Sequence, residues 1–115
     1  MKLTNGNMWE SIQILTKVNE TGKLGYACAR NLRKLIDANK EYMEVRDKLL
    51  AKYGKPEEQG RYSFEPEQAQ KFMEELQEYS NIEHDVDVFQ VDEDVFYSGN
   101  LTTKEMYILA WMVAA

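Results

Sequence analysis

The sequence predicts a mostly helical α+β protein with about four helices, one of them long, and a small antiparallel sheet. Three observations support this fold class. Apolar residues recur every three or four positions along most of the chain, which is the period of a helix buried on one side. One later stretch alternates apolar and polar residues instead, as a strand does. The length of 115 residues fits a single domain, residues 1–115, with one core.

The N-terminal segment is expected to form a short strand over residues 1–4 and then a helix that runs to about Asn19. Thr4 or Asn5 can cap the first turn of this helix, and Gly22 is a natural residue to close it. The helix face is set by four apolar residues at spacings of four, three and three: Met8, Ile12, Leu15 and Val18.

The long helix is expected over residues 25–53. Two series at heptad spacing predict an apolar seam along it: Ala29, Ile36, Met43 and Leu50 with Leu32, Asn39, Arg46 and Tyr53. We favour packing of this seam on the first helix, and a coiled coil between two copies is the alternative. A buried Asn39 would lower stability but define the register.

The next segment is a polar loop over residues 54–63, after which Pro66 suits the first position of a third helix. The buried stripe of that helix is predicted to hold Ala69, Phe72, Met73, Leu76 and Tyr79. Residues 82–91 alternate and read as a strand. We expect it to form one sheet with residues 1–4 and 62–64.

The C-terminal helix is predicted to begin at Thr102, which with Glu105 forms a capping box. From Met106 to Ala115 it carries no charge, and a helix that is apolar all round is buried all round. The run either lies in the core or docks on a second copy or another protein. The candidate partner interface consists of Tyr107, Trp111 and Met112, since Trp and Tyr are enriched at interfaces.

Charge is divided unevenly along the chain, whose net charge is −6. Residues 23–55 carry a net +5 and residues 56–100 a net −11. Direct binding to nucleic acid is not expected of an acidic chain. Three clustered cations, Arg30, Arg33 and Lys34, are a candidate site for a small anion.

Catalytic and metal-binding motifs are missing from the sequence. The single Cys28 and single His84 exclude an internal disulfide and a classical zinc site. No phosphate-binding loop and no HExxH motif occurs. A metal-dependent hydrolase built on Asp85, Asp87 and Asp92 is the weakest hypothesis. We therefore expect no enzyme activity, no catalytic residues, no metal and no cofactor.

The compartment is expected to be the cytoplasm of the cell that makes the protein. The N-terminus has no apolar region of the kind that signal peptides contain. The longest uncharged apolar run has ten residues, too few to cross a bilayer. No membrane partner is therefore predicted.

Several segments together resemble a known family. They are the opening MKLTNGN, the stretch ARNLRKL at 29–35, RDKLLAKYG at 46–54, FMEEL at 72–76, VDVF at 86–89 and LTTKE at 101–105. The chain is similar over nearly its whole length to a family of short uncharacterised phage and prophage proteins. The resemblance implies an origin in a phage or prophage, and it implies no activity and no catalytic residue.

The leading functional hypothesis is a non-catalytic phage interaction protein that binds a virion or host protein. The alternative is an antagonist of bacterial defence. It would either sequester a small anionic nucleotide, or use its acidic half to mimic nucleic acid. Self-association into a homo-oligomer is compatible with each hypothesis.

Overall fold

The computed structural model describes residues 1–114, and it confirms a mostly helical α+β fold. Within these residues lie six α-helices, two short 3-10 turns and two separate two-stranded antiparallel sheets. In chain order the elements are β1 (Lys2–Thr4), α1 (Asn5–Leu15), α2 (Gly22–Ala38), α3 (Lys40–Tyr53), β2 (Lys55–Pro56), η1 (Glu58–Gly60), β3 (Tyr62–Ser63), α4 (Pro66–Ser80), β4 (Glu83–Asp85), α5 (Glu93–Tyr97), α6 (Thr103–Ile108) and η2 (Ala110–Met112).

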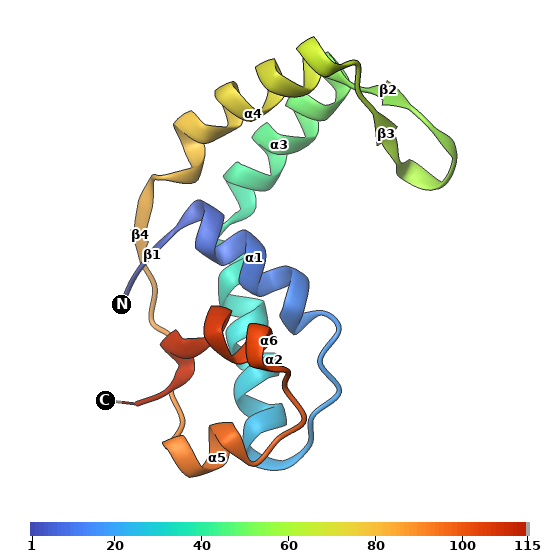
Figure 1. The fold of residues 1–115 in the computed structure, drawn as a ribbon. Helices are drawn as coiled ribbons and strands as arrows, with labels where there is room; N and C mark the ends of the chain where they lie inside the picture. The colour runs from blue at the N-terminus through green and yellow to red at the C-terminus, as the bar shows by residue number, and fades with distance from the viewer. Residues whose placement is uncertain (115) are drawn as a thin grey trace.

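The molecule is elongated and consists of a body and an arm (Figure 1). The body contains α1, α2, α5 and α6, whereas α3 and α4 pack side by side as the arm, with the β2–β3 hairpin at its tip. The principal extents are 46 × 29 × 22 Å. The radius of gyration, 15.9 Å, exceeds the roughly 13 Å expected of a compact chain of this length.

The first helix follows the sequence prediction at its start. Thr4 is the N-cap, and its side-chain oxygen accepts a hydrogen bond from the backbone nitrogen of Asn7 at 3.0 Å. Met8, Ile12 and Leu15 are buried along the predicted face. The helix ends at Leu15 rather than near Asn19, and Gly22 begins α2 instead of closing α1. The intervening Thr, Val and Asn residues have low helix propensity, which favours this earlier end.

The long helix predicted over 25–53 is broken at one residue. Asn39, whose backbone has φ −97° and ψ 3°, separates α2 from α3 and lets α3 turn away from the body to pair with α4 (Figure 1). The Asn39 side chain is fully buried and donates to the carbonyl oxygen of Asn5 at 3.1 Å. An Asn side chain that bonds to distant backbone offers an alternative to continuing the helix.

The predicted seam of the long helix is wrong in its first half, because Ala29 and Ile36 are exposed. The buried residues of α2 are instead Leu24, Ala27, Cys28, Asn31 and Leu35. This buried series lies one residue before the predicted one, and it packs on α1. The predicted packing of the Ala29 and Ile36 seam on the first helix is therefore wrong, and a coiled coil between two copies stays an untested alternative.

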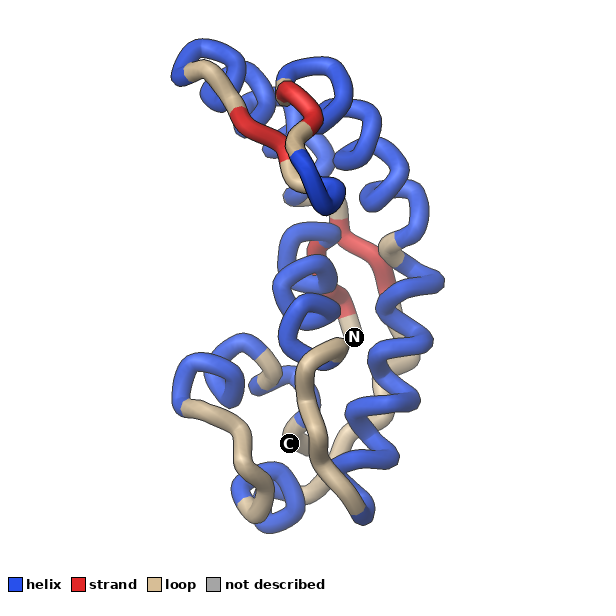
Figure 2. Tube along the Cα trace, turned by 90° about the vertical axis from the view of Figure 1, so that its right-hand side faces the viewer, coloured by secondary structure: helices blue, strands red, loops and turns tan. Residues whose placement is uncertain are grey.

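The three-segment sheet predicted from the sequence is also wrong. β1 pairs with β4, with Leu3 opposite His84, but β3 pairs with β2 on the arm. Figure 2 shows the β1–β4 pair where the arm meets the body. β4 ends at Asp85, short of residue 91, and the chain then runs extended past α2 until α5 begins.

The C-terminal segment begins as predicted. The Thr102 side chain accepts from the backbone nitrogen of Glu105, and the Glu105 carboxylate accepts from the backbone nitrogen of Thr102, so both parts of the capping box are present. α6 then stops at Ile108 and continues as η2. In this C-terminal segment Leu109 and Met112 are fully buried, whereas Tyr107 is 84% exposed. The expectation that the segment is buried on every side is therefore wrong. Ala115 lies outside the described residues.

Two separate groups of buried apolar residues hold the fold together. The larger one lies in the body and joins α1, α2, α5 and the C-terminal segment. The smaller one lies in the arm, around Tyr42, Leu49, Phe72 and Leu76. Within residues 1–114, no helix combines the length and apolar character needed to cross a membrane.

Candidate functional site

The exposed side of α2 carries two of the three candidate cations, Arg30 and Arg33, and the third, Lys34, lies beside it. Five residues at helical spacing are exposed on this side, and we call them the α2 face: Tyr26, Ala29, Arg30, Arg33 and Ile36. Tyr26 is 57% exposed and Ile36 is 43% exposed, so both side chains are accessible to a ligand or partner. Lys34 lies at the edge of this face, toward β4. The packing of the other side of α2 on α1 is what turns these side chains outward.

Arg30 is held in place by two aromatic rings. Its Nη1 donates to the hydroxyl oxygen of Tyr26 at 3.1 Å, and its guanidinium carbon lies 5.3 Å from the centre of the Phe89 ring. The Tyr26 and Phe89 rings meet edge to face, with centres 5.4 Å apart. The aliphatic and aromatic surroundings leave the guanidinium oriented but still accessible to solvent.

The other two cations differ in their partners. Lys34 Nζ lies 3.2 Å from a carboxylate oxygen of Asp87. Arg33 makes no ion pair and no side-chain hydrogen bond with any of residues 1–114, so its five donors are free for a ligand. The three predicted cations line one hollow of about 400 Å³ together with Tyr26 and Ala29, and we call it the cationic hollow.

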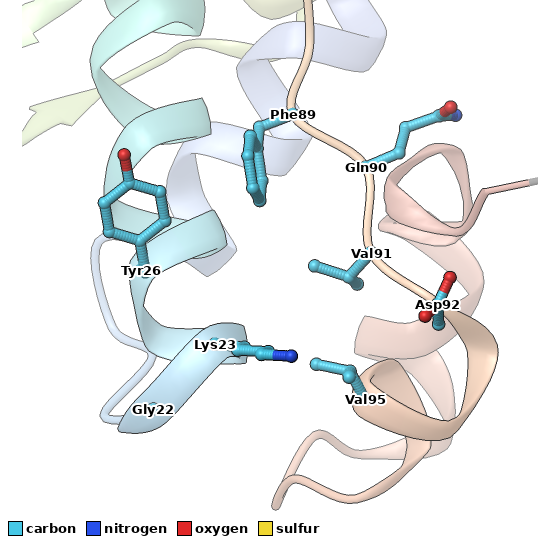
Figure 3. Close-up of a pocket in the computed structure, with 8 residues that line it drawn as sticks. All are labelled: Gly22, Lys23, Tyr26, Phe89, Gln90, Val91, Asp92 and Val95. Carbon is cyan, nitrogen blue, oxygen red and sulfur yellow. The ribbon is translucent and has the colours of Figure 1, made fainter.

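A second hollow, of about 450 Å³, lies on the other side of Tyr26. We call it the aromatic cavity (Figure 3), and its lining residues are Gly22, Lys23, Tyr26, Phe89, Gln90, Val91, Asp92 and Val95. They come from the start of α2, the extended chain before α5, and α5 itself. Tyr26 belongs to both hollows, which are therefore neighbours.

Asn31 fixes the extended chain that carries Phe89. Its amide nitrogen donates to the Phe89 carbonyl oxygen at 2.8 Å, and its amide oxygen accepts from the Phe89 backbone nitrogen at 2.7 Å. Sequence analysis missed Asn31, Tyr26 and Phe89 as members of the site. The only local signal was an asparagine in the middle of an otherwise apolar helix side.

The candidate partner interface from the sequence is divided by the fold. Met112 has no exposed surface and is a core residue, so it makes no contact with a partner in this conformation. Trp111 is partly buried, and its indole nitrogen donates to Ser11 Oγ at 3.0 Å. Only Tyr107 lies fully at the surface.

The single cysteine and the single histidine lie outside the α2 face, and they are buried and half-buried respectively. Burial and then the nearby Glu20 carboxylate raise the pKa of Cys28 to about 11, which keeps the thiol protonated at neutral pH. His84 is half-buried on β4, where it lies opposite Leu3 of β1. Among residues 1–114, no three His, Cys, Asp or Glu side chains converge in a way that suits a metal ion.

Comparison with known protein families, with curated proteins and with solved structures found no match to this chain.

Proposed function

We propose that this is a non-catalytic interaction protein, encoded by a phage or prophage, that binds a virion or host protein in the bacterial cytoplasm. The observation that supports this proposal is the composition of the α2 face. It exposes a tyrosine, two arginines and an isoleucine on one side of a helix of 17 residues. Tyr and Arg are among the residue types that contribute most to binding energy at protein interfaces.

The charge of the α2 face indicates the chemistry of the partner. Arg30 and Arg33 give it a positive field, and Arg33 has no internal partner among residues 1–114. A guanidinium binds a carboxylate with two parallel hydrogen bonds. The partner is therefore expected to present carboxylates around an apolar contact for Ile36.

The test is affinity capture of partners from the host cell with matched variants. Ile36→Asp and Arg33→Glu should each lose a stoichiometric partner that the unchanged protein retains. Ile82→Asp is the control for an exposed isoleucine elsewhere, since Ile82 is 47% exposed near β4. Lys48→Glu is the control for an exposed cation on α3. Circular dichroism confirms that each variant is folded.

The result that supports the proposal is capture by the two controls but not by the two α2 variants. Equal capture by all four variants would assign the interaction to another surface. Absence of any stoichiometric partner would overturn the protein-binding function itself.

A further inference from the structure

We propose that the two hollows on either side of Tyr26 form one binding site for a mononucleotide, with the base in the aromatic cavity and the phosphate in the cationic hollow. This site shares Tyr26, Ala29, Arg30 and Arg33 with the α2 face, but it extends through the aromatic cavity toward α5 and does not include Ile36. The two hollows are joined through one side chain, Tyr26, which lines both.

The aromatic cavity has the surfaces that a planar base requires. Phe89, Val91 and Val95 converge on its interior from two different segments of the chain (Figure 3). The Tyr26 ring closes one side and remains more than half exposed, so a ring of a ligand can contact it. Aromatic rings and apolar side chains bind the faces of bases without regard to sequence.

Lys23 gives the aromatic cavity a donor for the edge of a base. Its ammonium extends from the start of α2 toward Val95, whereas the Gln90 and Asp92 side chains point to the other side of the extended chain (Figure 3). The Gln90 amide nitrogen is already engaged with the carbonyl oxygens of Trp111 and Val113, at 3.0 and 3.3 Å. These two bonds hold the Gln90 side chain toward the C-terminal segment, pointing away from Tyr26, Val91 and Val95 (Figure 3).

The charges determine the direction in which the ligand lies. The aromatic cavity has one cationic side chain in its lining, Lys23, so it attracts a phosphate less strongly than the cationic hollow does. On the other side of Tyr26, by contrast, three cations surround the cationic hollow. Asp87 already neutralises part of the Lys34 charge, so Arg33 supplies the strongest free contact for a phosphate.

The volume also fits this class of ligand. Small-molecule pockets span roughly 300–1,000 Å³, and the aromatic cavity of about 450 Å³ falls within that range. The phosphate then occupies the neighbouring hollow of about 400 Å³. A bare oxyanion would use only the second hollow and leave the first empty.

The experiment is a titration of the isotope-labelled full chain with AMP, GMP, CMP and UMP, followed by NMR amide shifts. Adenosine and inorganic phosphate are titrated separately, to test each half of the ligand alone. At least one mononucleotide is expected to shift amides on both sides of Tyr26, at residues 22–34 and 86–95. It is expected to bind more tightly than either half.

Two variants remove one half of the site each. Val95→Phe fills the aromatic cavity and should weaken mononucleotide binding by about tenfold or more while leaving phosphate binding unchanged. Lys34→Ala removes a phosphate contact and should weaken mononucleotide binding by about tenfold. Lys48→Ala, the matched cation control on α3, and Ile36→Asp, which tests only protein docking, should both bind the mononucleotide normally.

Three results would overturn the proposal. The first is no shift at either segment at 10 mM of each probe, a concentration on the order of weak millimolar affinities. The second is phosphate binding as tight as mononucleotide binding, which would make the hollow a plain oxyanion site. The third is equal loss of binding in Lys34→Ala and Lys48→Ala. Capture of a protein partner is judged separately with Ile36→Asp, because Ile36 lines neither hollow.

Discussion

Asn31 and Phe89 exchange two hydrogen bonds although they lie 58 positions apart in the sequence. The amide of Asn31 thereby satisfies the backbone donor and acceptor of Phe89, as a neighbouring strand would, in the extended chain between β4 and α5. Because that chain carries Phe89 and Val91, the position of the aromatic cavity depends on one amide of α2. The packing of α2 and the binding site proposed beside it are therefore linked through this residue.

Replacement of Asn31 by alanine is expected to destabilise the protein by about 2–3 kcal/mol. The substitution leaves the backbone nitrogen and the carbonyl oxygen of Phe89 without partners in a partly buried place. Urea unfolding measures the change. Asn19→Ala, at an exposed loop position, is the control and should stay within about 0.5 kcal/mol of the unchanged protein. Similar stability of the two variants would contradict the importance of the bond pair.

The capping box of α6 permits a test with neighbouring residues. Thr102→Ala removes the side-chain acceptor for the Glu105 nitrogen and should lower the free energy of unfolding by about 1 kcal/mol. Thr103 is the first residue of α6 and makes no capping bond, so Thr103→Ala should have a smaller effect. Thermal unfolding at one pH compares them. Equal losses would show that the cap contributes nothing specific.

The C-terminal apolar segment should respond differently at its buried and its exposed residues. Leu109→Ala opens a cavity at a fully buried position and is expected to destabilise the protein by about 3 kcal/mol. Tyr107→Ala changes a side chain that is 84% exposed and should have little effect on stability. Chemical denaturation of both variants checks this. A large loss for Tyr107→Ala would contradict its surface position.

The arm contains a carboxylate whose titration is altered by its neighbours. The Tyr53 hydroxyl, followed by Lys52, lowers the pKa of Glu75 from its usual value of 4.5, although partial desolvation opposes them. The charged form of Glu75 therefore stabilises the fold above its unfolded pKa, and this contribution is lost as the pH falls through the lower folded pKa.

Carboxyl NMR titration measures this effect directly. Tyr53→Phe removes the hydrogen bond to Glu75 and should raise the pKa of Glu75 toward its usual value. The matched control is Tyr79→Phe, which alters a hydroxyl near the other end of α4 and should leave Glu75 as it was. An unchanged pKa in Tyr53→Phe would show that the hydroxyl does not act on the carboxylate.

Local patterns were enough to predict several elements. Pro66 begins α4, Thr102 caps α6, and the α1 face is buried as its spacing requires. Each of these features depends on residues within one or two turns of each other, which a sequence displays directly. The fold class followed from the same periodicities.

The rest depends on contacts between distant segments. On α2, the series with Cys28, Asn31 and Leu35 lies one residue from the predicted series with Ala29, Leu32 and Ile36, and both include apolar residues. Contact with α1 decides between them, and that contact has no local signal. The observed packing leaves Arg30 and Arg33 exposed, and the sequence analysis had already grouped these two residues as an anion site. It had no signal for the contacts that Tyr26 and Phe89 make with Arg30, because Phe89 lies in a distant segment.

The separate packing of body and arm has a consequence for how the protein unfolds. The arm core rests on four buried residues, and its link to α1 includes the Arg46 guanidinium, whose central carbon lies 4.3 Å from the centre of the Trp9 indole. Segments with few buried contacts open at lower free energy than the rest of a fold. Amides of α3 and α4 should therefore exchange with deuterated solvent sooner than those of α1 and α2, while the α2 face stays intact. The proposed binding surface on α2 would then keep its structure while the arm is locally unfolded.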